Sequence, residues 1–235
     1  MKRFVTRETD LTSWEIGGFY ALPNDVAHHV CDVMRLGSGD DIELVDAHQN
    51  LIAARIQKSG EVLCLAHEAC VMGQQRFDVS LGVALFKWPR FEWMLEKVTE
   101  FGVSRVFPIV CERSIIKVSD WDKKADRLEK IIVEAARQSL NPRPPVLAKP
   151  QKLSDFLATP PCSQLYFAHL GNYPTLSSRL SDASGAIGFV IGPEGGFSPQ
   201  EVELLSANAR PVSLGATVLR AETAAIACAA TLALT

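Results

Sequence analysis

The most restrictive feature of this chain is a glycine-rich turn between an apolar run and the start of a helix. It reads Ile191-Gly192-Pro193-Glu194-Gly195-Gly196-Phe197-Ser198-Pro199-Gln200-Glu201. Ser198 is a favourable N-cap, Pro199 suits the first helical position, and Glu201 stands where it completes a capping box. Phe197 and Val202 have the spacing of a hydrophobic staple. The sequence therefore predicts a sharply defined turn at the end of a strand, where glycines let a ligand approach bare backbone.

A second glycine-containing segment, Leu214-Gly215-Ala216-Thr217-Val218-Leu219-Arg220-Ala221-Glu222-Thr223-Ala224, precedes an apolar helix that runs to Leu234. Glycine turns of this kind also connect strands to helices without binding anything. The first turn lacks the Gly-Lys-Ser/Thr ending of a P-loop and the spacing of G-x-G-x-x-G, which disfavours nucleoside triphosphates. A cofactor with an adenine and a carboxylate but no phosphates fits these turns better.

Length and composition limit the classes of protein to which these turns can belong. With 235 residues and 47% hydrophobic content, the chain can form one large domain or two smaller ones. No run approaches the roughly 20 apolar residues of a membrane span, and the first residues do not resemble a signal peptide, so we expect a cytoplasmic protein. The six cysteines lack C-x-x-C spacing, which favours ordinary thiols over a zinc site or disulfides.

Charge is distributed unevenly along the chain. The net charge of −3 argues against an indiscriminate nucleic-acid binder. Residues 1–72 carry 6 Lys/Arg against 11 Asp/Glu, whereas residues 105–152 carry 11 Lys/Arg against 6 Asp/Glu. The middle of the chain can therefore face phosphates, although a solvated helix face with mixed ion pairs would give the same count.

The hydrophobic pattern changes near residue 72. Before it, a helix is expected at 25–36 and short strands at 41–45, 51–56 and 62–66, which together indicate a small β-barrel. After it, buried strands are expected at 79–86, 105–110, 164–168 and 186–191, and helices at 92–101 and 122–139. Gly102 stands where a left-handed helix cap is expected. Strands alternating with helices predict an α/β sheet with a ligand site beyond the carboxyl ends of its strands.

Several blocks of the sequence resemble one enzyme family. The two glycine segments are similar to signature blocks of the ribosomal RNA small subunit methyltransferase E family, which is of the SPOUT class. Upstream segments agree in the same order, so the resemblance spans nearly the whole chain. They are His29-Val30 with Val33-Met34-Arg35-Leu36 and Gly39-Asp40, Glu96-Lys97-Val98-Thr99-Glu100-Phe101-Gly102-Val103, Pro108, Glu112-Arg113-Ser114 and Glu134-Ala135-Ala136-Arg137-Gln138-Ser139.

The resemblance implies a fold and an activity. The fold is an N-terminal PUA-like β-barrel over residues 1–72 and a SPOUT-type α/β domain with a deep trefoil knot over residues 73–235, in a homodimer. The activity is transfer of a methyl group from S-adenosylmethionine (SAM) to N3 of one uridine in 16S ribosomal RNA of the small subunit. No metal is expected.

The chemistry of methyl transfer points to two residues of the second segment. The enzyme must align donor and nucleophile and manage the charge on uracil as N3 loses its proton. Arg220 is the candidate for stabilising the developing anion or its phosphate, and Glu222 is the candidate general base. Two other roles remain open: the two residues can form an ion pair that fixes the loop, or Glu222 can cap the helix that follows.

Cofactor contacts are expected in three segments by the same resemblance, mostly from backbone atoms. His169 can either approach the cofactor or face solvent. The residues are Leu165, Phe167, His169, Leu170, Gly171, Ile191, Gly192, Pro193, Glu194, Gly195, Gly196, Leu214, Gly215, Val218, Leu219, Thr223 and Ala224.

RNA contacts are expected at Arg3, Arg7, Arg35, Arg113, Gln138 and Arg143, because phosphates need guanidinium or ammonium partners. Arg35 can instead pair with Asp40, and Arg7 with Glu8 or Asp10. The chain departs from the family in one place: Asn141 stands where an arginine is usual, and Arg137 replaces a common acidic residue. We therefore expect the charge at Arg137 or Arg143, and the detailed RNA footprint stays open.

Two rival functions share some of these features. A SPOUT enzyme that methylates a ribose 2′-hydroxyl usually has a Ser-Leu-Asn block where this chain has Val218-Leu219-Arg220. A non-catalytic ribosome-assembly factor would not need the intact glycines or the pair Arg220 and Glu222. Both alternatives are therefore disfavoured.

Overall fold

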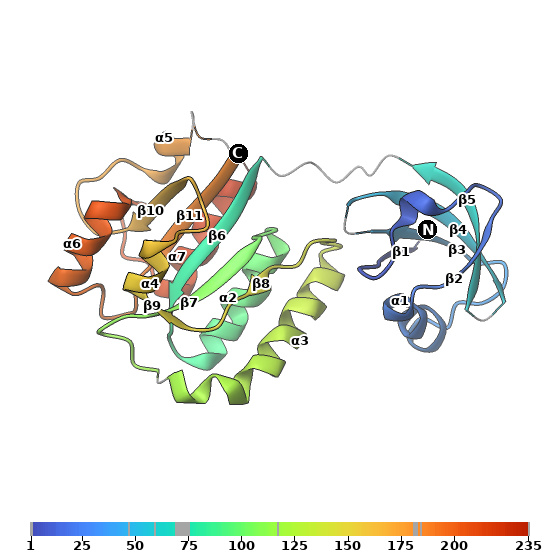
Figure 1. The fold of residues 1–235 in the computed structure, drawn as a ribbon, viewed down its shortest axis with the longest axis horizontal. Coiled ribbons are helices and arrows are strands. Elements are labelled where there is room, and N and C mark those ends of the chain that lie inside the picture. The colour runs from blue at the N-terminus through green and yellow to red at the C-terminus, as the bar shows by residue number, and fades with distance from the viewer. Residues whose placement is uncertain are drawn as a thin grey trace. The chain divides into compact units, whose positions relative to one another are not determined.

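The computed structural model describes residues 2–46, 48–58, 60–68, 76–116, 118–180, 183 and 185–234. The chain divides into two compact units (Figure 1). Unit 1 comprises Met1–Gln74 and Ala136–Arg143, and unit 2 comprises Gln75–Ala135 and Pro144–Thr235. The boundary expected between residues 72 and 73 lies outside the described residues.

Unit 1 is built on a five-stranded sheet with the order β1-β3-β4-β5-β2. Its strands β3 and β4 begin at the residues that hydrophobic alternation predicts. Only the pair β1 and β3 is parallel, and the other neighbours are antiparallel. Buried residues from these strands and from the helical segment between β2 and β3 form one core. The strands are β1 (Lys2–Val5), β2 (Phe19–Ala21), β3 (Asp41–Val45), β4 (Leu51–Lys58) and β5 (Glu61–Glu68).

The helix expected at 25–36 forms with a change of winding. A short α-helix, α1 (Asn24–His28), continues directly into a π-helical turn, η2 (His29–Val33). Arg35 follows with a φ of 51°, a left-handed conformation that is uncommon for a residue other than glycine. The segment that resembles the family's barrel motif is therefore a locally irregular turn.

Unit 2 contains a seven-stranded parallel sheet with the order β12-β10-β11-β6-β7-β8, and β9 also pairs with β7. The nearly continuous apolar run in β6 suits a strand that is covered on both faces. Its register places Val83 of β6 opposite Ile191 of β11. The strands are β6 (Phe77–Ala84), β7 (Arg105–Val110), β8 (Val146–Leu147), β9 (Gln151–Lys152), β10 (Gln164–Ala168), β11 (Gly185–Ile191) and β12 (Arg210–Val212).

Helices cover both faces of this sheet and enclose two hydrophobic clusters (Figure 1). The larger cluster includes residues of α2 (Trp88–Glu100), α3 (Asp122–Gln138), α5 (Leu176–Leu180) and α7 (Ala221–Ala233). The smaller cluster, on the other face, includes residues of α4 (Leu153–Ala158) and α6 (Pro199–Asn208). The remaining helical turns are η1 (Leu11–Ser13) and η3 (Val118–Asp120).

Two helices end in left-handed caps. At the end of α2, Gly102 has a φ of 74°, its N–H donates to the Thr99 carbonyl, and the Val103 N–H donates to the Val98 carbonyl. This is the Schellman arrangement, which confirms the expected role of Gly102. After α3, Leu140 takes the same role with a φ of 55°.

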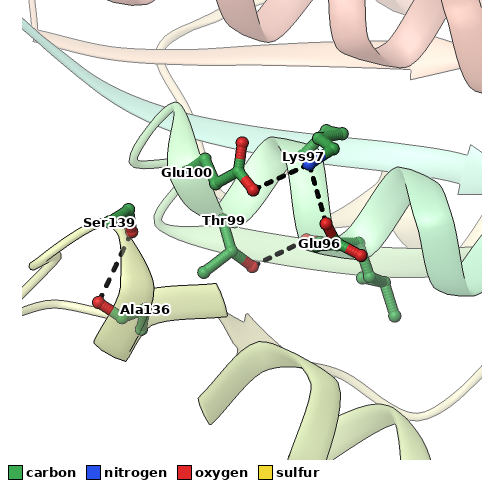
Figure 2. A network of polar contacts seen from close by, with 7 residues as sticks. Glu96, Lys97, Thr99, Glu100, Ala136 and Ser139 are labelled. Atoms are coloured by element: carbon green, nitrogen blue, oxygen red, sulfur yellow. Dashed lines mark hydrogen bonds and ion pairs between the residues drawn. The ribbon is translucent and has the colours of Figure 1, made fainter. Parts of the chain in front are cut away.

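The segment of α2 that resembles a family block is stabilised by its own side chains (Figure 2). Lys97 Nζ lies 2.7 Å from Glu96 Oε1 and 2.9 Å from Glu100 Oε1. The hydroxyl of Thr99, which is fully buried, donates to the Leu95 carbonyl one turn earlier. These contacts define the second half of the helix whose first turn borders the candidate site.

Candidate cofactor and catalytic site

Three loops of unit 2 leave the sheet at one edge. Strands β12, β10, β11 and β6 are consecutive parallel neighbours, so their carboxyl ends lie side by side. The loop after β10 contains His169, the loop after β11 is residues 192–198, and the loop after β12 is residues 213–220. We call the last two the first and the second glycine loop. The parallel order thus brings together the three segments that the sequence assigns to the cofactor.

The first glycine loop is held by the start of α6. The Ser198 hydroxyl accepts from the Glu201 N–H at 3.3 Å, and the Glu201 carboxylate accepts from the Ser198 N–H at 2.8 Å. These two bonds confirm the predicted capping box. Phe197 is buried in the smaller cluster, against which Val202 also packs. The second oxygen of Glu201 accepts from the Glu112 N–H at 2.8 Å, which ties the loop to the segment after β7.

Arg113 holds the same loop through its carbonyl groups. Its Nη1 donates to Gly195 O at 3.0 Å and to Phe197 O at 3.2 Å. The sequence assigned Arg113 to RNA, but these bonds give its guanidinium a partner within the protein. A role in RNA binding stays a prediction, and it would have to share the side chain with the loop.

The glycines of the first loop are required for different reasons. A Cβ at Gly192 would lie 3.0 Å from the Phe197 ring, and one at Gly195 would lie 3.3 Å from the Arg113 Cβ. Gly196 has a φ of 68°, which other residues rarely adopt, and the space beside it is open. Two of these glycines therefore make room for the protein's own side chains, while Gly196 leaves room next to the backbone.

The second glycine loop has few internal restraints. Gly215 has open space where a Cβ would stand, and its N–H donates to the Ser213 hydroxyl at 3.3 Å. Val218 is 75% exposed. Arg220 is exposed and is the N-cap residue of α7, where its side chain makes no capping bond. The candidate catalytic arginine thus stands at a helix start with its guanidinium open to solvent.

Glu222 lies in the first turn of α7 and is buried, with 5% of its surface exposed. Its partner is Arg90 of α2, whose Nε lies 3.6 Å from Glu222 Oε1. The ion pair with Arg220, which the sequence left open as an alternative, is therefore replaced by a pair with another arginine. Arg90 Nη1 also lies 3.9 Å from Glu194 Oε1 in the first glycine loop. The other oxygen of Glu222, Oε2, is buried and makes no hydrogen bond. A buried carboxylate oxygen without a donor is costly, and such atoms often mark functional positions.

The loop after β10 carries His169 between two aromatic rings. The centroid of its ring lies 5.8 Å from that of Phe167 and 5.8 Å from that of Tyr173. The backbone N–H of His169 donates to the Val212 carbonyl at 3.1 Å, which fixes the backbone of His169 against β12. Leu170, the next residue, is 68% exposed.

The predicted cofactor residues fall into two groups. Leu165, Phe167 and Ile191 lie within strands and have buried side chains that pack in the two clusters. For them, any contact with a ligand must come from the backbone. The others lie in the three loops or in the first turn of α7: His169, Leu170, Gly171, Gly192, Pro193, Glu194, Gly195, Gly196, Leu214, Gly215, Val218, Leu219, Thr223 and Ala224. Their contacts with a cofactor stay a prediction.

The arginines of unit 1 that were assigned to RNA have different environments. Arg3 Nε lies 2.7 Å from Glu43 Oε2, so its charge is paired. Burial lowers the pKa of Arg7, although the nearby Asp25 opposes that shift. Arg35 is exposed, and Asp40, which could have paired with it, accepts from the Gly37 N–H instead. Gln138 and Arg143 are also exposed and lie in unit 1.

The described cysteines are free thiols. Burial, with the nearby Glu201 adding to the effect, raises the pKa of Cys111 to about 12, so this thiol stays protonated at neutral pH. Among the residues that the structure describes, no group of three or more His, Cys, Asp and Glu side chains could hold a metal ion. Within the same residues, no helix combines the length and apolar character that crossing a bilayer demands.

Arg90 is the site residue that the sequence did not predict. The helix was expected to begin at 92, after Pro89, whereas α2 begins at Trp88 with Pro89 in its first turn. Proline is well tolerated there because its missing N–H would have no helical partner. Reading Pro89 as an early helical position would have placed Arg90 in the first turn, at the edge of the sheet where the glycine loops lie.

Comparison with known proteins agrees with this geometry. Residues 73–233 match a family model described as an RNA methyltransferase domain, and residues 22–64 match an RNA methyltransferase PUA domain. The ribosomal RNA small subunit methyltransferase E of Synechocystis is 31% identical over 204 residues, covering 84% of this chain and 67% of that protein. The corresponding protein of Rickettsia conorii is 29% identical over 210 residues, covering 85% and 82%.

Solved structures extend the similarity to the fold. The ribosomal RNA small subunit methyltransferase E of Neisseria gonorrhoeae, bound to SAM, matches with a TM-score of 0.77 and 25% identity over 99% of this chain and 96% of that one. A putative methyltransferase of Legionella pneumophila in complex with SAM gives a TM-score of 0.79 and 26% identity over 98% and 96%. The family models, the relatives and the edge at which three loops converge lead to one conclusion: this chain belongs to the ribosomal RNA small subunit methyltransferase E family.

Proposed function

We propose that this protein uses SAM to methylate N3 of one uridine in 16S ribosomal RNA. The observation that carries the proposal is the meeting of both glycine loops with Arg220 and Glu222 at the carboxyl edge of a parallel sheet. Family membership supports the reaction, and the relatives solved with SAM support the cofactor. The relatives are ribosomal RNA small subunit methyltransferases, which supports ribosomal RNA as the substrate, and the resemblance of the sequence blocks to the family supports N3 of a uridine as the acceptor.

Two observations indicate that the residues at this edge of the sheet can bind SAM. Space is open beside Gly196 and Gly215, one in each glycine loop. Leu170 and Val218 are exposed apolar side chains in loops of the same edge, and they suit an adenine or a methionine chain. When bound, SAM supplies an electrophilic methyl group. The backbone of the three loops would hold it, and residues 192–196 would form the floor.

The chain's own side chains manage the uracil. N3 of uracil must lose a proton before it can act as a nucleophile, and the resulting charge spreads onto the neighbouring carbonyl oxygens. The exposed guanidinium of Arg220 stabilises that charge. Glu222 accepts the N3 proton, and its carboxylate is held in a buried position with one oxygen that has no donor. Both roles require the uracil to enter between the start of α7 and the first glycine loop.

The finer features of the family complete the proposal. They are a deep trefoil knot in the α/β domain, a PUA-like domain over residues 1–72, a SPOUT domain over residues 73–235, and action in the cytoplasm as a homodimer. Arg3, Arg7, Arg35, Arg113, Gln138 and Arg143 contact the RNA. Because unit 1 is acidic, recognition depends on RNA shape and a few placed arginines.

The decisive experiment maps the methylated atom. Small ribosomal subunits that lack endogenous modification are incubated with the protein and SAM carrying a radiolabelled methyl group, and the labelled nucleotide is located and analysed by mass spectrometry. We expect one 3-methyluridine in 16S ribosomal RNA. A ribose 2′-O-methyl group would contradict the proposed chemistry, and no incorporation together with no thermal shift on addition of SAM would indicate a non-catalytic assembly factor.

A further inference from the structure

Arg90 contacts both the first glycine loop and the helix that follows the second glycine loop. It lies in the first turn of α2, which follows β6, and β6 is the direct neighbour of β11 in the sheet. The start of α2 and the first glycine loop therefore leave the sheet at the same edge. Helix α7, which follows the second glycine loop, packs against α2 in the larger hydrophobic cluster.

The guanidinium of Arg90 lies within 4 Å of two carboxylates, one in the first glycine loop and one just after the second. It is 3.9 Å from Glu194 of the first loop and 3.6 Å from Glu222, just after the second. The side chain of Arg90 is 37% exposed and that of Glu222 is 7% exposed. The Arg90 end of this ion pair therefore faces solvent, and the Glu222 end is buried. One arginine thus links three segments that are far apart in the sequence.

Because its carboxylate is buried, Glu222 depends on the ion pair with Arg90 more than Glu194 does. Keeping a carboxylate charged away from water requires a nearby opposite charge. Among the residues that the structure describes, Arg90 is the cation within ion-pair distance of Glu222. Both distances from Arg90 are longer than a hydrogen bond, so each contact is an ion pair and not a direct hydrogen bond.

From this arrangement, and resting on the proposed function, we infer that Arg90 is a positioning residue for methyl transfer. Its guanidinium orients the Glu222 carboxylate as the proton acceptor and ties the first turn of α7 to the first glycine loop. Because Arg220 is the N-cap of α7, the same contact sets where the Arg220 guanidinium stands relative to the loop that holds the cofactor. Arg90 itself touches neither the transferred methyl group nor the uracil.

The test compares Arg90→Gln with a matched control, Arg127→Gln. Arg127 also pairs with a glutamate of α2, through two bonds of 2.8 Å to Glu92, but on an exposed face. With SAM at saturation, we expect kcat of Arg90→Gln on unmodified small subunits to fall about 10- to 100-fold, the range typical of residues that orient an active-site group. The Kd for SAM should change less than about threefold, and Arg127→Gln should keep the wild-type kcat.

Three further variants show whether Arg90 acts through Glu222. Arg90→Lys keeps the charge but not the forked geometry, so its kcat should lie between those of the wild type and Arg90→Gln. The double variant Arg90→Gln with Glu222→Gln should be no slower than Glu222→Gln alone, because the positioned group is already lost. A double variant that is slower by the full factor of Arg90→Gln would overturn the inference.

The remaining outcomes are also decisive. A wild-type kcat in Arg90→Gln, or an equal loss in the Arg127→Gln control, would refute the positioning role. If Arg90→Gln does not fold, Arg90→Lys decides: a kcat at least about threefold lower at an unchanged melting temperature supports the role, and a wild-type kcat refutes it. If the wild-type protein itself transfers no methyl group to the subunit, the proposed function fails instead, and the two failures are therefore distinguishable.

Discussion

The two glycine loops lie at the same sheet edge but are held very differently. The first is fixed by the Ser198–Glu201 capping box, by the Glu112 N–H and by two bonds from Arg113. The second is held at its start, where Ser213 bonds to the backbone of Pro174 and Leu176 and to the Gly215 N–H. Further on, Val218 is largely exposed and the side chain of the N-cap residue Arg220 makes no capping bond. The first loop is therefore preorganised, whereas the second can adjust.

From this difference we expect the two loops to have different functions. A preorganised backbone lowers the cost of binding a cofactor, because few degrees of freedom are lost when it binds. A loop that carries the candidate catalytic arginine gains from freedom to move if it has to close on a substrate that arrives separately. We therefore expect changes in the first loop to act on cofactor affinity and stability, and changes in the second to act on turnover.

The largest expected effect comes from the second loop. Arg220→Ala removes the group proposed to stabilise the uracil anion, so we expect kcat to fall by about 100-fold or more. The Kd for SAM should remain near the wild-type value, because the loop backbone is unchanged. Methyl transfer to unmodified subunits and calorimetry with SAM measure the two quantities, and an unchanged turnover would remove Arg220 from the mechanism.

The next effect concerns the left-handed turn of the first loop. Gly196→Ala places a Cβ at a φ of 68°, which should destabilise unit 2 by about 1–2 kcal/mol and weaken SAM binding. Thermal denaturation with and without SAM measures both. Gly195→Ala is the contrasting variant, because there the obstacle is the Arg113 side chain at 3.3 Å and not the backbone conformation. Equal melting temperatures for wild type and Gly196→Ala would show that the turn is less rigid than its bonds indicate.

Arg113 provides the sharpest test between a loop role and an RNA role. Arg113→Ala leaves the carbonyls of Gly195 and Phe197 without their donor, so the Kd for SAM should rise about tenfold. An arginine that serves RNA alone would instead raise the KM for the subunit and leave SAM binding unchanged. Calorimetry with SAM in the absence of RNA separates the two results.

A smaller effect is expected at the start of α6. Ser198→Ala removes the acceptor for the Glu201 N–H, and loss of such a cap costs about 1 kcal/mol. The melting temperature should fall, while kcat at saturating SAM stays within about twofold of the wild type. A large loss of kcat would mean that the first loop takes part in chemistry as well as in binding.

The smallest effect is expected at His169. Its ring lies against Phe167 and Tyr173, but its backbone is held by the bond to Val212, so His169→Ala should leave the loop in place. Calorimetry with SAM should show a change in Kd of less than about threefold. A rise in the Kd for SAM of tenfold or more would show that the imidazole contacts the cofactor. The loop after β10 would then act in cofactor binding together with the first glycine loop.

The larger elements could be predicted from the sequence because their local signals agree with their tertiary environment. Strand β7 and the start of α3 lie where hydrophobic periodicity places them, and Gly102 and Ser198 cap helices as their types predict. Short elements such as β12, α4 and α5 had too few residues to show a period. The π-turn after α1 and the left-handed Leu140 depend on tertiary packing, which no local pattern reveals.

The candidate site was predictable where the sequence itself carries the feature. The glycine loops, the capping box and the presence of Arg220 and Glu222 could all be read directly. The link through Arg90 could not, because an ion pair between α2, the first loop and α7 depends on which strands are neighbours in the sheet. The bonds from Arg113 to the loop carbonyls were missed for the same reason.

The three-residue edge strand β12 has a consequence for biosynthesis. It pairs with β10 and leads into the second loop and α7, which contain Arg220 and Glu222. A growing polypeptide that ends before residue 210 can build the earlier strands but has no complete site. Competence for methyl transfer therefore arises only after the segment from β12 to the first turn of α7 has been made and has docked on the sheet.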